Sequence, residues 1–100
     1  MRILACDLGA LDAAQRARHS VLRTELGAHR LDAREVADGY VFSYPSEPDV
    51  IMKLAEFVTL ERRCCAFFDF ALDVPAGASQ VRLTIGGSPH VKEFLRSELG

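Results

Sequence analysis

The chain has 100 residues, of which 49% are hydrophobic and 26% charged, and its net charge is −2. These values predict one small soluble domain over residues 1–100, with enough chain to bury a core without staples. They exclude nucleic-acid binding through a basic surface, and no apolar stretch approaches the ~20 residues that span a membrane. The odd cysteine count and the absence of a signal peptide predict a cytoplasmic protein whose thiols are reduced.

The first third of the chain predicts a short strand or extended arm over residues 2–6 and an alanine-rich helix over residues 10–26. The inward face of this helix is predicted to hold Leu11, Ala14, Val21, Leu22 and Leu26. Gly27 is the expected C-terminal stop. His19 lies beside that face, and we interpret it as a half-exposed residue because no partner at ligand spacing accompanies it.

A hairpin is predicted over residues 29–36 and 40–45, because Asp38-Gly39 is a strong signal for a tight turn. Aromatic residues alternate along its second strand, and alternation of this kind is typical of a strand face that packs on a core. The second helix is predicted over residues 49–64, with Ser46 or Asp49 as its N-cap.

Two further strands and a helix complete the predicted fold. Alternating apolar residues mark the strands at Phe68, Phe70 and Leu72, and at Val81, Leu83 and Ile85. A helix follows Ser88-Pro89, with Val91, Phe94, Leu95 and Leu99 facing inward. The predicted class is α+β, in the order (β)-α-β-β-α-β-β-α. Four or five mostly antiparallel strands form one layer, with two or three helices on one face.

The end of the second helix carries the residues that suggest chemistry. Its apolar stripe runs from Val50 through Leu54, Phe57 and Val58 to Cys64 and Cys65, and Glu61 falls within that stripe. A carboxylate there is unexpected, because burial penalises its charged form unless a metal ion, a cation or a proton compensates. Glu61 lies three and four residues before the cysteines, so both thiols can approach it. The alternative is that Glu61 reaches solvent at a frayed helix end.

The adjacent cysteines Cys64 and Cys65 have two interpretations. Adjacent Cα atoms lie about 3.8 Å apart, which is shorter than the usual disulfide span. A bond between these two sulfurs would therefore be strained, whereas two neighbouring thiolates suit one soft ion. The alternative is that both simply pack, because free cysteine behaves as a small apolar residue.

The chain resembles a family of small uncharacterised bacterial proteins, and the resemblance covers most of its length. The matching segments are Ala5-Cys6, Glu61-Arg62-Arg63-Cys64-Cys65-Ala66-Phe67 and Thr84-Ile85-Gly86-Gly87. In that family a proline follows the cysteine pair, where this chain has Ala66. The resemblance implies that Cys6, Glu61, Cys64 and Cys65 belong together, and it identifies no substrate.

Three hypotheses for function follow. In the first, Cys6, Cys64 and Cys65 bind Zn²⁺, Cu(I), Hg²⁺ or arsenite, with Glu61 as a hard ligand or neighbouring acceptor. In a catalytic extension of this hypothesis, protonated Glu61 delivers a proton to a metal-bound ligand. In the second hypothesis the cysteines carry out thiol-redox chemistry. In the third the chain is a non-catalytic interaction module, such as a homodimer, whose cysteines only pack. The roles of His29 and His90 stay open.

Overall fold

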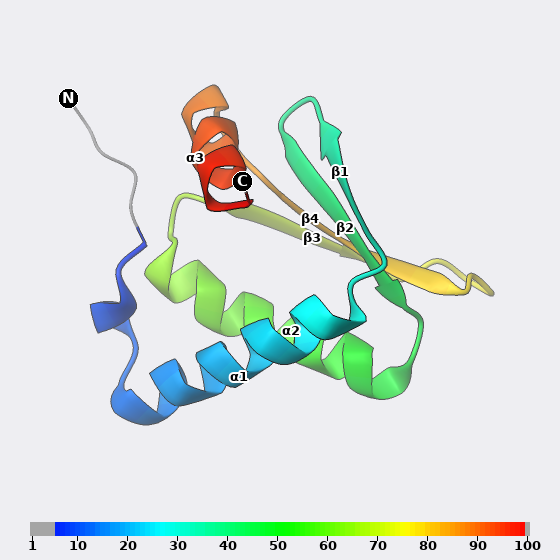
Figure 1. The fold of residues 1–100 in the computed structure, drawn as a ribbon, viewed down its shortest axis with the longest axis horizontal. Helices are drawn as coiled ribbons and strands as arrows, with labels where there is room; N and C mark the ends of the chain where they lie inside the picture. Colours follow the sequence, from blue (N-terminus) through cyan, green and yellow to red (C-terminus); the bar gives the residue numbers. More distant parts are fainter. Residues whose placement is uncertain (1–5, 100) are drawn as a thin grey trace.

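The computed structural model describes the chain from Cys6 to Leu99, with side chains over residues 6–96. The elements, in chain order, are η1 (Leu8–Ala10), α1 (Ala13–His29), β1 (Asp32–Val36), β2 (Gly39–Pro45), α2 (Pro48–Cys64), β3 (Asp69–Asp73), β4 (Gln80–Gly86) and α3 (Pro89–Leu99). The predicted α+β order is confirmed (Figure 1). The predicted arm or strand over residues 2–6 lies, apart from Cys6, outside the described residues, as does the side chain of Leu99.

The four strands form one antiparallel sheet in the order β1-β2-β4-β3. The aromatic residues of β2 lie on the face that the helices cover, and Phe42 and Tyr44 are only 5% and 6% exposed. α3 reaches the same face, because its Arg96 contacts the hydroxyl of Tyr40. The predicted single layer with helices on one face is therefore confirmed, and so is the core position of the aromatic stripe.

Helix α1 starts and ends later than predicted. It begins with a capping box, in which Asp12 and Gln15 each accept from the other's backbone N–H. It continues through Gly27 to His29, because Gly27 keeps a negative φ instead of the left-handed conformation that ends helices. The prediction that Gly27 stops the helix is wrong, and this glycine lies in the last turn.

The buried face of α1 also differs from the prediction. The buried residues are His19, Leu22 and Leu26, spaced three and four apart. Val21 is 45% exposed, because a position two residues from His19 points to a different side of the helix. Ala14 is likewise exposed, whereas Leu11 is buried in the loop before the helix.

Helix α2 lies antiparallel to α1 along the sheet (Figure 1), and Arg18 of α1 pairs with Glu56 of α2 at 2.8 Å. Its N-cap is Glu47, followed by Pro48 at the first helical position, so the predicted Ser46 and Asp49 caps are wrong. No helix among the described residues is long and apolar enough to cross a membrane.

The β1–β2 turn is made by Ala37 and Asp38 instead of Asp38-Gly39. Gly39 already belongs to β2, and a Cβ built there would overlap the carbonyl oxygen of Ile85 on β4. The glycine is therefore needed for the close approach of the two central strands, not for the turn.

Candidate functional site

The last turn of α2 brings Glu61, Cys64 and Cys65 to one side of the helix, as their spacing predicts. The helix closes at Cys65, whose backbone N–H donates to the Glu61 carbonyl oxygen over 2.7 Å. The cysteines are 3% and 1% exposed, so both sulfurs face the interior. This turn forms one wall of the candidate site.

The segment that precedes α1 is fastened to this turn. The backbone N–H of Asp7 donates to the Cys64 carbonyl oxygen over 2.7 Å. This contact brings Cys6 beside Cys65, and the structure joins the two in a disulfide with Cα atoms 4.5 Å apart. The expectation that all thiols are reduced is therefore wrong for this pair, and Cys64 is the free cysteine.

The carboxylate of Glu61 is the centre of the cluster. Its Oε1 lies 3.1 Å from His19 Nε2, 3.3 Å from Cys64 Sγ and 3.4 Å from Cys65 Sγ. Of the two sulfurs, only Cys64 Sγ has a proton to donate to the carboxylate, because Cys65 is in the disulfide. The Glu61 side chain is 15% exposed. It is therefore a largely buried group with partners, not a boundary residue that reaches into water.

The sulfurs of Cys64 and Cys65 lie 3.9 Å apart and are not bonded to each other. Burial, followed by the hydrogen bond and negative charge of Glu61, raises the pKa of the Cys64 thiol to about 11. The thiol is protonated at neutral pH as a result, and a protonated thiol is a poor nucleophile. The arrangement as it stands therefore disfavours Cys64 as an attacking group.

His19 is the site residue that the sequence interpretation missed. It is 6% exposed, stacks on Phe57 with ring centroids 5.5 Å apart, and contacts Glu61 from the neighbouring helix. The available signal was its position three residues before Leu22 and seven before Leu26, which places it on the buried stripe of α1. His29 is half-buried and His90 is exposed, and neither belongs to the cluster.

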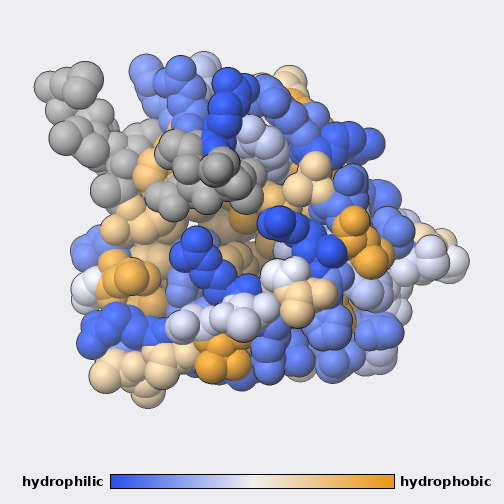
Figure 2. Space-filling model, viewed as in Figure 1, coloured by the Kyte–Doolittle hydropathy of each residue, from blue (hydrophilic) through white to orange (hydrophobic). Residues whose placement is uncertain are grey.

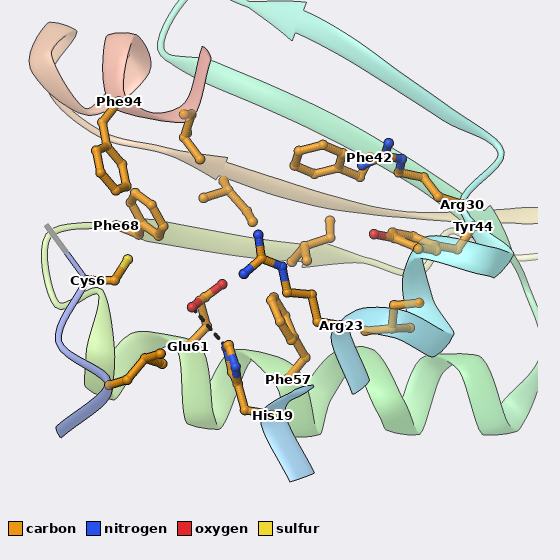
Figure 3. Close-up of a pocket in the computed structure, with 16 residues that line it drawn as sticks. Cys6, His19, Arg23, Arg30, Phe42, Tyr44, Phe57, Glu61, Phe68 and Phe94 are labelled. Atoms are coloured by element: carbon orange, nitrogen blue, oxygen red, sulfur yellow. Dashed lines mark hydrogen bonds and ion pairs between the residues drawn. The ribbon is translucent and has the colours of Figure 1, made fainter. Parts of the chain in front are cut away.

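A cavity of about 270 Å³ opens from this cluster. Cys6, His19 and Glu61 form part of its wall, and the rest is mainly apolar residues of the sheet, α2 and α3. Figure 2 shows a hollow near the centre of this face, with apolar residues inside it and hydrophilic residues at its border. Figure 3 shows Cys6, Glu61 and His19 together on one side of the cavity.

Two sets of side chains have ligand atoms close enough to share a metal ion. Cys6, Glu61 and Cys65 form one, and His19, Glu61 and Cys64 form the other, with all atoms of a set within 4.8 Å of one another. Glu61 belongs to both, so the sets make one continuous cluster. The structure therefore brings together all four predicted site residues and adds His19.

Comparisons with protein-family models, with curated proteins and with solved structures find no match.

Proposed function

We propose that the reduced protein binds a soft or borderline metal or metalloid ion through this cluster. Cys64 provides a thiolate, Glu61 an oxygen and His19 a nitrogen, and opening the disulfide adds the thiolates of Cys6 and Cys65. The candidate ions are Zn²⁺, Cu(I), Hg²⁺ and arsenite, all of which thiolate ligands suit.

The spacing of the donor atoms around Glu61 carries this proposal. Zinc bonds of about 2.0 Å to nitrogen or oxygen and about 2.3 Å to sulfur, in tetrahedral geometry, place neighbouring ligand atoms roughly 3.3–3.8 Å apart. The separations from Glu61 Oε1 are 3.1 Å to His19, 3.3 Å to Cys64 and 3.4 Å to Cys65, and the two sulfurs are 3.9 Å apart. These four separations are close to the spacing of ligands on one ion, but His19 and Cys65 belong to different three-residue sets and must approach each other for all four donors to share an ion.

The mixed donor set favours Zn²⁺ among the four candidates. Imidazole and carboxylate suit a borderline ion, whereas Cu(I), Hg²⁺ and arsenite prefer sulfur alone. The softer ions would use Cys6, Cys64 and Cys65 and leave Glu61 and His19 as neighbours. A zinc site therefore depends on His19, and a three-sulfur site depends on Cys6.

The test is to purify the protein under reducing conditions, without added metal, and to measure metal content and accessible thiols. We expect the reduced protein to take up one Co²⁺ in place of Zn²⁺, with the absorption bands of a thiolate-bound tetrahedral ion. Cys64→Ser with Cys65→Ser should abolish those bands. His19→Ala should weaken Zn²⁺ binding more than Cu(I) binding, and Cys6→Ser should do the reverse.

A suitable control is His90→Ala, which removes an exposed imidazole outside the cluster. It should bind ions as the wild type does. The proposal fails if reduced protein carries no metal, if all three thiols titrate freely, and if Zn²⁺, Cu(I) and arsenite leave its melting temperature unchanged, because an ion that binds the folded state must stabilise it.

Thiol-redox chemistry is the second candidate, and the Cys6–Cys65 disulfide is the observation that favours it. Cys6 is exposed, so an external thiolate can attack its sulfur, and the Cys65 sulfur then leaves as a thiolate. The raised pKa of Cys64 argues against that residue as the nucleophile. Equilibration in glutathione buffers tests this candidate, because a redox-active pair changes state within the physiological range whereas a structural disulfide stays oxidised.

The interaction-module hypothesis loses the feature that was to support it. An aromatic strand face left open would mark a docking surface, but Phe42 and Tyr44 lie under the helices. A homodimer stays a prediction, and sedimentation of the purified protein measures it directly.

A further inference from the structure

The cavity that opens from the thiol cluster is larger than an ion requires. Its volume of about 270 Å³ lies just below the range of roughly 300–1,000 Å³ that holds drug-sized ligands. The rings of Phe68 and Phe94 line one end (Figure 3), and Leu95 and Ile85 also belong to the wall. These walls present hydrocarbon to the cavity, so the part of a ligand that lies there must be apolar.

The opposite end carries cationic and hydroxyl groups. Arg30 lies over the Phe42 ring, with its guanidinium carbon 5.5 Å from the ring centroid, and Tyr44 lies beside it (Figure 3). The Tyr44 hydroxyl has no hydrogen-bond partner among the side chains of residues 6–96. Arg23 extends its guanidinium to the middle of the cavity, toward Glu61 and away from Arg30 and Tyr44 (Figure 3). Neither arginine has a carboxylate within ion-pair distance in the part of the chain that the structure describes.

These groups select for an anion at this end. The Arg30 guanidinium only donates hydrogen bonds, the Tyr44 hydroxyl can donate one, and a carboxylate is the acceptor whose geometry matches a guanidinium. Glu61, the one acidic residue of the wall, lies toward the Cys6 side (Figure 3). Its charge repels a bound carboxylate from that side and leaves the Arg30 end as the favourable position.

Gly27 is the position in the cavity wall where a larger side chain can be introduced without a clash. It lies in the last turn of α1 and in the cavity wall, with no positive φ that would require glycine. A Cβ built there would meet no atom within 4 Å. The fold would accept a larger residue, and glycine destabilises a helix relative to alanine. Gly27 is exposed, so neither packing nor backbone conformation requires glycine at this point of the cavity wall.

We infer that this cavity binds a small carboxylic acid with an apolar body. The carboxylate lies between Arg30 and Tyr44, and the apolar body lies against Phe68 and Phe94, near Cys6. The volume accommodates a single short hydrocarbon chain or one aromatic ring, not a complete lipid. The inference does not depend on ion binding by the cysteines.

The test uses sodium octanoate as the probe and isothermal titration calorimetry of the full-length protein. We expect saturable one-to-one binding. Octanamide, which has the same chain and no charge, should bind at least about tenfold more weakly, the loss expected for a charge-assisted pair. Acetate, which has the charge and no chain, should show no saturable binding. Equal binding of octanamide and octanoate, or no saturable octanoate binding, would overturn the inference.

Variants locate the binding in the cavity. Gly27→Leu fills open space and should reduce octanoate affinity by more than about tenfold while circular dichroism shows an intact helix. Arg30→Ala should weaken binding by at least about fivefold, the order expected for one charge-assisted contact. Arg34→Ala removes an equal charge from exposed strand β1, outside the cavity wall, and should change nothing. Unchanged octanoate affinity in Gly27→Leu would place the binding elsewhere and overturn the inference.

Two cross-tests separate this inference from the proposed ion site. Octanoate should still bind the Cys64→Ser, Cys65→Ser variant, because neither sulfur holds the carboxylate. Gly27→Leu should still bind Zn²⁺ in its reduced form. Loss of octanoate binding in the cysteine variant, if that variant is folded, would contradict a cavity site that is independent of the thiols.

Discussion

Removing the Cys6–Cys65 disulfide should cost a large part of the stability of this small protein. The bond closes a loop with a sequence separation of 59 residues, which contains α1, the β1–β2 hairpin and α2. The chain-entropy model assigns about 3 kcal/mol to a loop of about 15 residues and about 4.7 kcal/mol to one of about 100, so this loop corresponds to about 4 kcal/mol. That is about a quarter or more of the roughly 5–15 kcal/mol that holds a typical domain folded.

Cys6→Ser is the suitable variant, because Cys6 is exposed and its replacement leaves no cavity. Urea unfolding under non-reducing conditions should give a free energy of unfolding about 4 kcal/mol below that of the oxidised wild type. Wild-type protein kept in reducing agent is the control, and it should match the variant. The reasoning is refuted if Cys6→Ser and the oxidised wild type differ by less than about 1 kcal/mol.

Three further predictions concern single contacts. His19→Ala and Glu61→Ala should be coupled by about 1–3 kcal/mol in a double-mutant cycle of urea unfolding, because each leaves the other without its buried partner; a coupling below about 0.5 kcal/mol would contradict this. The rate at which Cys64 is alkylated in the oxidised protein, followed by mass spectrometry, should rise with pH up to about pH 11, because its pKa is raised from 9.0. A rate that reaches its plateau below pH 9 would contradict this prediction. Gly39→Ala should destabilise the protein by about 2 kcal/mol or more, because the added Cβ overlaps Ile85; thermal unfolding that stays unchanged would show that the strands can separate at no cost.

Much of the fold was predictable because its local signals agree with one another. Alternation identified the core strands around Phe42, Leu83 and Leu72, and the register pairs these residues across the sheet. The start of α3 at Pro89 followed from its preference for the first helical position. Glycines were predicted less well, because the sequence does not say whether a glycine ends a helix, forms a turn or allows a close approach of two backbones. Gly27 was predicted to end the first helix, although it lies within α1.

The candidate site was predictable only within one segment. The spacing of Glu61, Cys64 and Cys65 needs no knowledge of other elements, and the resemblance added Cys6. The contact between His19 and Glu61 could not be predicted in this way, because it depends on how α1 packs along α2. The two residues are 42 positions apart in the chain. The disulfide depends in turn on the hydrogen bond from Asp7 to the end of α2, which no local pattern specifies.

The disulfide and the proposed ion site compete for the same sulfur, and this competition gives a quantitative test. Reduction adds two electrons and two protons to the Cys6–Cys65 pair, and an ion that binds only the resulting thiolates must favour the reduced state. Its midpoint potential should therefore rise by about 30 mV for each tenfold excess of free Zn²⁺ over the dissociation constant. The pair is equilibrated in thiol–disulfide buffers with free Zn²⁺ set by a chelator, and thiols are trapped by alkylation.

His19→Ala is the informative control for that titration, because it keeps all three cysteines and removes one proposed ligand. It should leave the potential in the absence of Zn²⁺ nearly unchanged and reduce the shift that Zn²⁺ produces. A wild-type potential that does not respond to Zn²⁺ means that the ion does not distinguish the two states, which is incompatible with Cys65 as a ligand. The Cys6–Cys65 pair would then be a redox or structural disulfide, and the contacts of Glu61 with His19 and Cys64 would have to be explained by packing alone.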